Sequence, residues 1–391
     1  MSSRGSDMDM DAHLNETERA VVERARLFAR DEIAPKAPGW AVTREVPLET
    51  TKAAAEAGLC GLVVPEADGG SGLGISAMAR VVEELAAVDF GFPFGLVVHN
   101  NLAGSIARNG SDEQRRRFLP DMLAARRIGA FLLTEPGSGS DAAAIATRAE
   151  RDGEGWVLNG EKAWITNTVT AEVLSVYAQT DPAAGWRGIA CFLVDADTRG
   201  VKRGPTYEMM GCHAAGVGGF RFEDCRIGEA DLFLAPGEAF KAALFGIDIA
   251  RIIVAAGCCG MLRTGIDTAL SYAMQRRAFG QATADFQGLQ WMLADAETDW
   301  RAARLLTVEA GRLHDAGDPR APLAAAHAKK FAPRICLARL ADCMQVMGAA
   351  GYSHDYPLAR HLAAAKMAQI VDGTTEIQNV VISRAMRKAA G

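Results

Sequence analysis

The hydrophobic pattern of this chain changes twice, and these changes limit the folds that it can adopt. Up to about residue 127 the pattern is helical, with Asn15 and Glu18 forming a capping-box signature ahead of apolar residues at helical spacing. Residues 128–236 have a strand-like pattern, and helical spacing then returns. We therefore expect three domains: a helical one at 1–127, a β one at 128–236 and a second helical one at 237–391.

The middle stretch consists of short runs rich in β-branched and aromatic residues, separated by Gly, Asn and Asp. These runs are Ile128 to Leu133, Trp156 to Leu158, Ala163 to Thr166, Val173 to Ala178, Ile189 to Val194 and Phe220 to Phe222. Asn159-Gly160 is a strong signal for a two-residue hairpin turn.

The outer stretches carry clear helix signals. Ser111 with Gln114 predicts another helix start. In the C-terminal part, apolar residues recur at alternating steps of four and three, which predicts one buried stripe on a long helix. They are Leu289, Leu293, Ala296, Trp300, Ala303, Thr307 and Ala310.

Length and charge exclude several protein classes. A chain of 391 residues has room for two or three folded units with a large shared core. The net charge of −6 argues against a protein that mainly binds nucleic acid or an anionic membrane. No apolar run approaches the roughly 20 residues of a membrane span, and none of the eight cysteines forms a CxxC pair. The N-terminus is acidic and unlike a transit peptide. We expect a cytoplasmic, soluble protein with reduced thiols and no metal site.

A Gly/Ser-rich loop follows the first strand-like run, from Thr134 to Asp141. Glycine lets backbone N–H groups converge on an acceptor-rich ligand, although the segment can also be an ordinary loop. Gly137-x-Gly139-x-x-Ala142 superficially matches a dinucleotide fingerprint, with Glu161 near the position of a ribose-binding acid. Hairpin-rich β structure follows in place of alternating strands and helices, so the NAD interpretation is disfavoured.

Two further segments contain residues suited to a large planar, phosphate-bearing ligand. Trp164 and Thr166 place a flat indole beside a hydroxyl, although a half-buried strand tryptophan is the simpler explanation. Arg276 and Phe279 lie at the end of a predicted helix, and Gln287 follows Arg276 by eleven residues. The planar fork of arginine suits a pyrophosphate, whereas a solvated arginine is the alternative.

Asp372 precedes Gly373 in an otherwise apolar stretch that includes Met367, Ile370 and Val371. Such an acid is commonly a helix N-cap or a turn residue. It can instead be desolvated, and desolvation raises the pKa of a carboxyl group into the range of a working base.

In this order, these four segments resemble the acyl-CoA dehydrogenase family over nearly the whole chain. Supporting matches are Pro65-Glu-Ala-Asp-Gly-Gly, Met210-Gly211, Phe222-Glu-Asp224, Arg251, Gln345-Val-Met-Gly348 and Gly351-Tyr352. The resemblance implies an α+β multi-domain fold: an N-terminal all-α domain, a middle β-barrel-like domain and a C-terminal four-helix bundle. It also implies a homotetramer with one FAD in each subunit.

The resemblance assigns roles residue by residue. The residues placed at the FAD are Phe131, Leu133, Thr134, Ser140, Trp164, Thr166, Arg276, Phe279, Gln287, Gln345, Gly348, Thr374 and Glu376. Four of them are implied to reach the cofactor across a subunit interface: Arg276, Phe279, Gln287 and Gln345. Those placed at the substrate are Ser140, Asp248, Arg251 and Gly373.

The implied chemistry is the α,β-dehydrogenation of an acyl thioester on CoA or a carrier protein, which is an oxidation of a CH–CH bond. Asp372 removes the α-proton while the β-hydrogen leaves as hydride to the flavin. The backbone N–H of the base residue is implied to be one of the donors to the enolate oxygen. An electron-transfer flavoprotein is the expected acceptor.

This sequence departs from the family pattern near the base. The usual base is Glu, and Asp reaches about 1.5 Å less, while Ala250 fills the alternative base position on the helix near Arg251. The usual Arg-Asp pair is Ala363-Ala364, and His213 to Val217 replace an Arg-x-Ser-x-Thr run. These changes leave open an oxygen-using oxidase or monooxygenase similar to nitroalkane oxidases. A binding protein without turnover would need a lost base, whereas Asp372 is present.

Three other residues have structural interpretations. His99 lies on a predicted helix near the expected acyl pocket and is interpreted as a structural histidine. Cys258 and Cys259 are interpreted as buried helix residues, because nothing in the sequence indicates a lowered thiol pKa.

Overall fold

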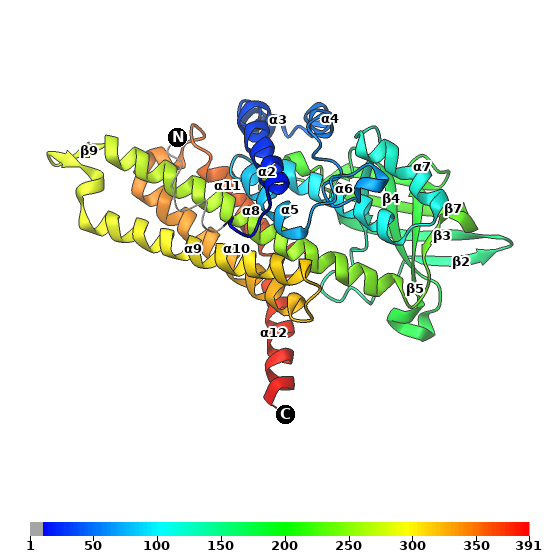
Figure 1. Cartoon of the computed structure of the whole chain (residues 1–391). Helices are drawn as coiled ribbons and strands as arrows, with labels where there is room; N and C mark the ends of the chain where they lie inside the picture. Colours follow the sequence, from blue (N-terminus) through cyan, green and yellow to red (C-terminus); the bar gives the residue numbers. More distant parts are fainter. Residues whose placement is uncertain (1–10, 391) are drawn as a thin grey trace.

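The computed structural model describes residues 11–390, and its N-terminal part is helical. Both predicted capping boxes are present, since the Asn15 and Ser111 side chains accept from the N–H groups of Glu18 and Gln114. The helices are α2 (Glu16–Phe28), a π-helical turn (Ala29–Ile33), α3 (Ala37–Thr43), α4 (Leu48–Glu56), α5 (Ile75–Ala86), α6 (Gly91–Asn109) and α7 (Asp112–Leu123). Figure 1 shows them above and beside the long helices of the C-terminal part.

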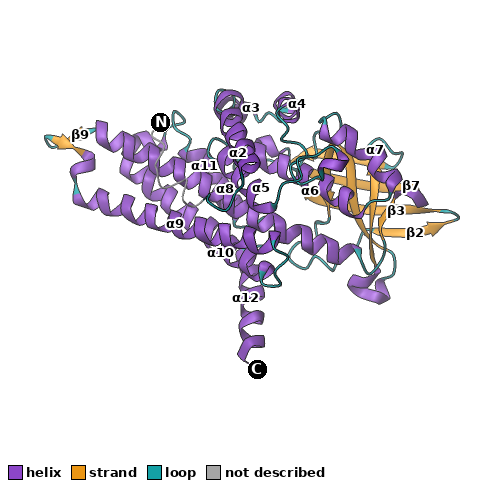
Figure 2. Cartoon of the chain, in the orientation of Figure 1, coloured by secondary structure: helices purple, strands orange, loops and turns teal. Residues whose placement is uncertain are grey.

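A mixed sheet follows, and Figure 2 shows it at one end of the molecule. Its eight strands are β1 (Ile128–Leu132), β2 (Arg148–Asp152), β3 (Gly155–Ile165), β4 (Ala171–Gln179), β5 (Ile189–Asp195), β6 (Val201–Thr206), β7 (Gly218–Gly228) and β8 (Leu232–Leu234). The strand order is β6-β7-β3-β2-β4-β5-β8, and β1 pairs in parallel with β4. One face packs under α6 and α7, and the other forms a separate apolar core.

The prediction of a hairpin turn at Asn159-Gly160 was wrong. Both residues lie inside β3, and the hairpin turns instead at Gly153, where Asp152 pairs with Gly155. Gly160 has φ +150°, and a side chain there would meet Thr147 at 2.5 Å. The register of β3 against β7 also shifts at this point, so the Asn-Gly pair forms an irregularity within a strand. Glycine inside a strand often marks such an irregularity or the close approach of another chain segment.

The C-terminal part is a bundle of long helices. They are α8 (Ala239–Gln275), α9 (Gln287–Asp315), α10 (Ala321–Met347), α11 (Leu358–Ala368) and α12 (Thr375–Ala390). A small hairpin, β9 (Arg277–Ala278) and β10 (Gln281–Ala282), joins α8 to α9 at the end farthest from the sheet, and α12 projects from the bundle (Figure 1). The predicted stripe on α9 is confirmed from Ala296 to Ala310. The predicted fold, with an N-terminal helical part, a sheet in the middle of the chain and a C-terminal helical bundle, is confirmed.

Helix α8 is the core of this bundle. Length and composition alone would let it cross a membrane, so the expectation that no apolar run approaches that length was wrong. However, 67% of its most apolar window is buried inside the protein, as in a core helix. Gly260 allows close contact with α5, because a Cβ there would lie 2.1 Å from the Glu83 carbonyl oxygen.

A buried ionic cluster ties α5 to the bundle. Arg80, Glu83 and Arg304 are each no more than 2% exposed. Arg304 donates to both carboxylate oxygens of Glu83, and Arg263 of α8 pairs with Glu84. Apolar periodicity does not reveal such a cluster, because charged residues normally predict a solvent-facing position.

Candidate active site

Asp372 lies in the short loop between α11 and α12. Its φ of +53° and the +92° of Gly373 put two successive residues in the left-handed region. The Asp372 carbonyl oxygen accepts a hydrogen bond from Arg251 Nε at 3.2 Å, and Arg251 Nη1 contacts Asp248 Oδ1 at 2.7 Å. The structure thus brings together four residues predicted at the base and substrate: Asp372, Gly373, Arg251 and Asp248.

Two buried side chains, from α10 and α12, donate hydrogen bonds to the backbone around the same loop. Lys329 of α10 donates from Nζ to the carbonyl oxygens of Ala368, at 2.7 Å, and Gly373, at 3.3 Å. Gln378 of α12 donates to the Gly373 oxygen at 2.9 Å. A Cβ on Gly373 would lie 2.8 Å from the Gln378 amide, so glycine is required here on both conformational and steric grounds.

The electrostatic environment favours the neutral acid at Asp372. Burial raises the pKa of Asp372, and the nearby charges of Lys329 and Arg251 oppose this rise. Burial also raises the pKa of Asp248 and lowers that of Lys329 to about 8. Within residues 11–390, neither the Asp372 carboxyl group nor its backbone N–H forms a hydrogen bond. A carboxyl group without donors and with a raised pKa is suited to accept a proton.

The other two predicted residues of this region lie at the start of α12. Thr374 Oγ1 accepts from Ile377 N at 3.4 Å and so caps the helix. Glu376 is exposed. The capping role that the sequence offered as the alternative for Asp372 is thus taken by Thr374.

A second group of predicted residues lies on the sheet. Ala163 N donates to Thr134 O at 3.0 Å, which joins the loop after β1 to β3. Trp164 has φ +59° and is 61% exposed, with its ring 4.6 Å from that of Tyr207. Thr166 is only 9% exposed. A large aromatic surface is therefore exposed two residues before a nearly buried threonine, at a strained backbone position of the kind that occurs at functional sites.

The remaining predicted residues of the sheet side lie along β1 and the loop after it. Phe131 is partly buried with its ring 5.1 Å from that of Tyr177, Leu133 is buried, and Ser140 is exposed. The Gly/Ser loop closes on itself through Glu135 and Ser138 and leads into bends, with no helix after it. A dinucleotide fingerprint requires that helix, which supports the exclusion of the NAD interpretation.

A buried ion pair supports this loop. Lys162 of β3 is fully buried and donates to Leu133 O at 3.0 Å and to Glu135 Oε1 at 2.7 Å. Glu135 also accepts from the backbone N–H groups of Ala146 and Thr147. The pKa of Glu135 is lowered because these donors and the Lys162 charge outweigh burial, and burial lowers the pKa of Lys162 to about 8.

The third group lies at the far end of the bundle. Phe279, on the β9–β10 hairpin, is 98% exposed, and Arg276, Gln287, Gln345 and Gly348 are also exposed. Arg276, the C-cap of α8, follows Arg251 by 25 residues, which is about 37 Å at 1.5 Å per residue. One chain therefore does not bring these residues to Asp372.

Helix α6 connects the sheet-side group to α8. Asn167, next to Thr166, donates from Nδ2 to the carbonyl oxygens of Gly95 and Gly129. Phe90, at the start of α6, packs on Gly257 of α8, where a Cβ would lie 2.5 Å from the ring. Because Arg251 lies on the same helix, one packed path joins the sheet side to the base loop.

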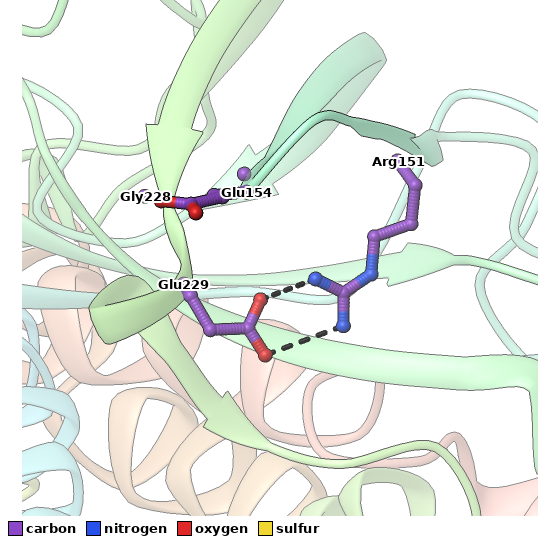
Figure 3. Close-up of a pocket in the computed structure, with 5 residues that line it drawn as sticks. Arg151, Glu154, Gly228 and Glu229 are labelled. Atoms are coloured by element: carbon purple, nitrogen blue, oxygen red, sulfur yellow. Dashed lines mark hydrogen bonds and ion pairs between the residues drawn. The ribbon is translucent and has the colours of Figure 1, made fainter.

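Two hollows differ in their relation to these residues. The larger, about 740 Å³, lies at the β2–β3 hairpin around the Arg151–Glu229 ion pair (Figure 3) and contains no predicted site residue. The smaller, about 290 Å³, lies between α3, the turn before α6, the segment 210–214 and α11. Its lining includes His213, Ala363 and Ala364, which replace the larger polar residues of the family pattern.

His99 and the cysteines have structural surroundings. His99 Nε2 contacts Met122 O at 2.9 Å and Nδ1 accepts from Gly129 N at 3.1 Å, while burial lowers the pKa of His99 to about 4. The histidine is therefore neutral, with both nitrogens occupied. All eight cysteines lie in the described part of the chain and are unpaired, and Cys258 and Cys259 are each 1% exposed.

Sequence reasoning missed Lys329, Gln378, Lys162 and Glu135. Each is polar, buried and bonded to the backbone of a loop that carries predicted site residues. One available signal was a lysine within an alanine-rich helical run, as at Lys329, where an apolar residue is expected.

Known proteins match this chain in all three of its parts, the N-terminal helices, the sheet and the C-terminal bundle. Three family models match: the N-terminal, middle and C-terminal domains of acyl-CoA dehydrogenases, at residues 15–126, 130–225 and 237–387. The mitochondrial isobutyryl-CoA dehydrogenase of Dictyostelium discoideum is 34% identical over 375 residues, which are 96% of this chain and 90% of that protein.

Two solved structures are similar throughout. The butyryl-CoA dehydrogenase of Megasphaera elsdenii has a TM-score of 0.92 and 31% identity, with 95% of this chain and 98% of that chain covered. A glutaryl-CoA dehydrogenase of Mycobacterium smegmatis, in complex with FADH2, has a TM-score of 0.91 and 30% identity, with 97% and 96% covered.

Proposed function

The chain belongs to the acyl-CoA dehydrogenase family, and on this premise we propose that it catalyses the FAD-dependent α,β-dehydrogenation of an acyl thioester with Asp372 as the base. One observation carries the proposal within this chain. Asp372 has a raised pKa and lies on a loop whose carbonyl groups are held by Arg251, Lys329 and Gln378. The carboxyl group is thereby fixed in place and kept basic.

The residues of the sheet side fit a flavin. Trp164 presents an exposed aromatic surface, Thr166 a hydroxyl, and the loop around Thr134 is stiffened by the Glu135–Lys162 pair. Planar rings stack on exposed aromatic side chains, and a hydroxyl can bond a ring nitrogen at the edge. When bound there, FAD would supply the acceptor for the hydride from the substrate β-carbon.

The proton chemistry belongs to the chain itself. The Asp372 carboxylate takes the α-proton of the thioester, and its raised pKa makes it a stronger base than an ordinary aspartate. The backbone N–H of Asp372 forms no hydrogen bond within the described residues, so it is available to donate to the thioester oxygen as negative charge develops there. Arg251, Asp248, Gly373 and Ser140 are proposed to contact the thioester ligand.

A second subunit is proposed to complete the cofactor site. The exposed group around Phe279 lies about 37 Å along α8 from Arg251. A nearly fully exposed phenylalanine and an arginine at one tip are a suitable contact for the distal part of a cofactor bound to another chain. We therefore propose a homotetramer, with an electron-transfer flavoprotein as the acceptor.

Flavin content and anaerobic reduction test the proposal. The purified protein should be yellow, and an anaerobic panel of acyl-CoA and acyl-carrier thioesters should include one that bleaches the flavin. A colourless protein that gains no FAD on reconstitution would contradict it. Rapid reoxidation by air with peroxide release would instead indicate an oxidase.

The base assignment has its own test. Asp372→Asn should retain FAD yet reduce it about 10²–10⁴-fold more slowly, because the amide cannot accept the proton. Asp355→Asn is the matched control, since Asp355 is exposed and, within the described residues, bonds only to Ser353. Near-normal reduction in Asp372→Asn would remove Asp372 from the mechanism.

A further inference from the structure

We infer that Lys329 is a positioning residue for the catalytic base: it ties the two sides of the Asp372 loop together and provides the unpaired positive charge that faces Asp372. The inference rests on the proposed function, since it concerns how strongly and in what place Asp372 acts as a base. It assigns a role to a buried lysine that the proposed chemistry does not otherwise use.

The geometry of the hydrogen bonds supports the positioning role. Lys329 is 1% exposed, and its ammonium group bonds the carbonyl oxygen four residues before Asp372 and the one directly after it. One side chain of α10 thereby bridges the end of α11 and the start of α12. Between these two points the chain takes the left-handed conformation at Asp372 and Gly373, which costs free energy unless the surroundings enforce it.

The missing counter-ion supports the electrostatic role. Among the described residues, no carboxylate oxygen lies within 4.0 Å of Lys329 Nζ, whereas the equally buried Lys162 contacts Glu135 at 2.7 Å. A buried ammonium group without a direct ion pair is unfavourable, and its field is not cancelled at short range. The charged neighbours of Lys329 are Asp372, which stabilises its ammonium form, and Arg251, which opposes it.

The other charged groups around the loop are arranged differently. From α8, Arg251 faces Asp372 but is paired with Asp248, and Cys258 of the same helix faces Lys329. From α12, Gln378 is neutral and Glu376 is exposed. Lys329 is therefore the cation whose removal changes the local charge most, and its loss should raise the pKa of Asp372.

A pH profile of flavin reduction tests the inference. Wild type, Lys329→Met and Lys329→Gln are loaded with FAD and mixed anaerobically with the best thioester of the panel, and the bleaching rate is followed from pH 5 to 9. The acid limb of this profile is the part where the bleaching rate falls as Asp372 becomes protonated. In both variants the acid limb should move to higher pH by about one unit. A shift of that size means about a tenfold lower rate on the acid side.

Lys330→Met is the matched control, because it makes the same change on the next residue of α10, which is only partly buried. Its acid limb should coincide with that of wild type. Lys329→Arg, which retains the charge and the donors, should restore the wild-type limb if Lys329→Met folds poorly.

The outcomes separate this inference from the proposed function. If no thioester bleaches wild type, the proposed function fails. If wild type bleaches and Asp372→Asn does not, yet the Lys329→Met and Lys329→Gln limbs coincide with wild type, only the role of Lys329 is overturned. A loss of protein stability alone leaves the acid limb where it was and also counts against the inference.

Discussion

Two places in this protein bring a buried lysine close to a carboxyl group, and the pKa of that carboxyl group shifts in opposite directions in the two places. On the sheet side Lys162 lies with Glu135, and on the bundle side Lys329 lies near Asp372. Burial lowers the pKa of both lysines to about 8. The pKa of Glu135 is nevertheless lowered, while that of Asp372 is raised.

The number of donors on each carboxyl group explains the difference. Glu135 accepts hydrogen bonds from Lys162 and from two backbone N–H groups, so its charged form is stabilised directly. The Asp372 carboxyl group accepts none within residues 11–390, and the nearby lysine bonds carbonyl oxygens instead. The same pair of residue types therefore forms a structural ion pair in one place and a candidate base in the other.

The largest expected difference between the two sites is in the free energy of unfolding of the lysine variants. Lys162→Met should cost about 3–5 kcal/mol, because it leaves the buried Glu135 carboxylate without its cation. Lys329→Met should cost about 1–3 kcal/mol, because it removes hydrogen bonds to carbonyl groups and breaks no direct ion pair. Urea unfolding of the FAD-loaded proteins measures both.

The control for this comparison is Lys330→Met, which should change stability by less than about 0.5 kcal/mol. If Lys329→Met cost as much as Lys162→Met, the contrast in stability between the two sites would be lost.

The order of the domains could be predicted from sequence because each depends on local patterns. The capping boxes at Asn15 and Ser111 and the stripe on α9 are repeated signals that packing reinforces. Asn159-Gly160 is a case in which the local sequence did not determine the local structure. The choice between a turn and a strand irregularity depended on pairing with β2 and β7, which the dipeptide does not encode.

The candidate site could be predicted only where residues carry a motif. Asp372, Thr166 and Arg276 were assigned to the site in this way, yet the sequence could not show that Arg276, at the end of α8, lies about 37 Å from Arg251. Lys329 and Gln378 were missed because their partners are backbone carbonyl groups, and any sequence supplies those.

Smaller changes in the free energy of unfolding, of opposite sign at the two sites, are expected when each carboxyl group is replaced by an amide. Glu135→Gln should lower the free energy of unfolding by about 1.5–3 kcal/mol, because it removes a charged acceptor of three hydrogen bonds. Asp372→Asn should raise it by about 1 kcal/mol, since a partly desolvated charge that lacks donors is replaced by a neutral group. Thermal and urea midpoints at pH 7 would show changes of opposite sign. Destabilisation by both substitutions would mean that Asp372 is stabilised as an anion after all.

The smallest expected effect is the pH dependence of the two stability changes, that of Glu135→Gln and that of Asp372→Asn. The lowered pKa of Glu135 contributes stability that is fully present above its ordinary value of 4.5 and is lost only as the pH falls through the lower, folded value. The raised pKa of Asp372 means that its charge costs stability fully above the folded value, and this cost fades as the pH falls toward 3.8. Lowering the pH from 7 to about 4.5 should therefore shrink the advantage of Asp372→Asn and preserve the penalty of Glu135→Gln. Each unit of pKa shift contributes about 1.4 kcal/mol, so unfolding midpoints at the two pH values can resolve the change. An advantage of Asp372→Asn that persists unchanged at the lower pH would show that it comes from packing and not from the charge on Asp372.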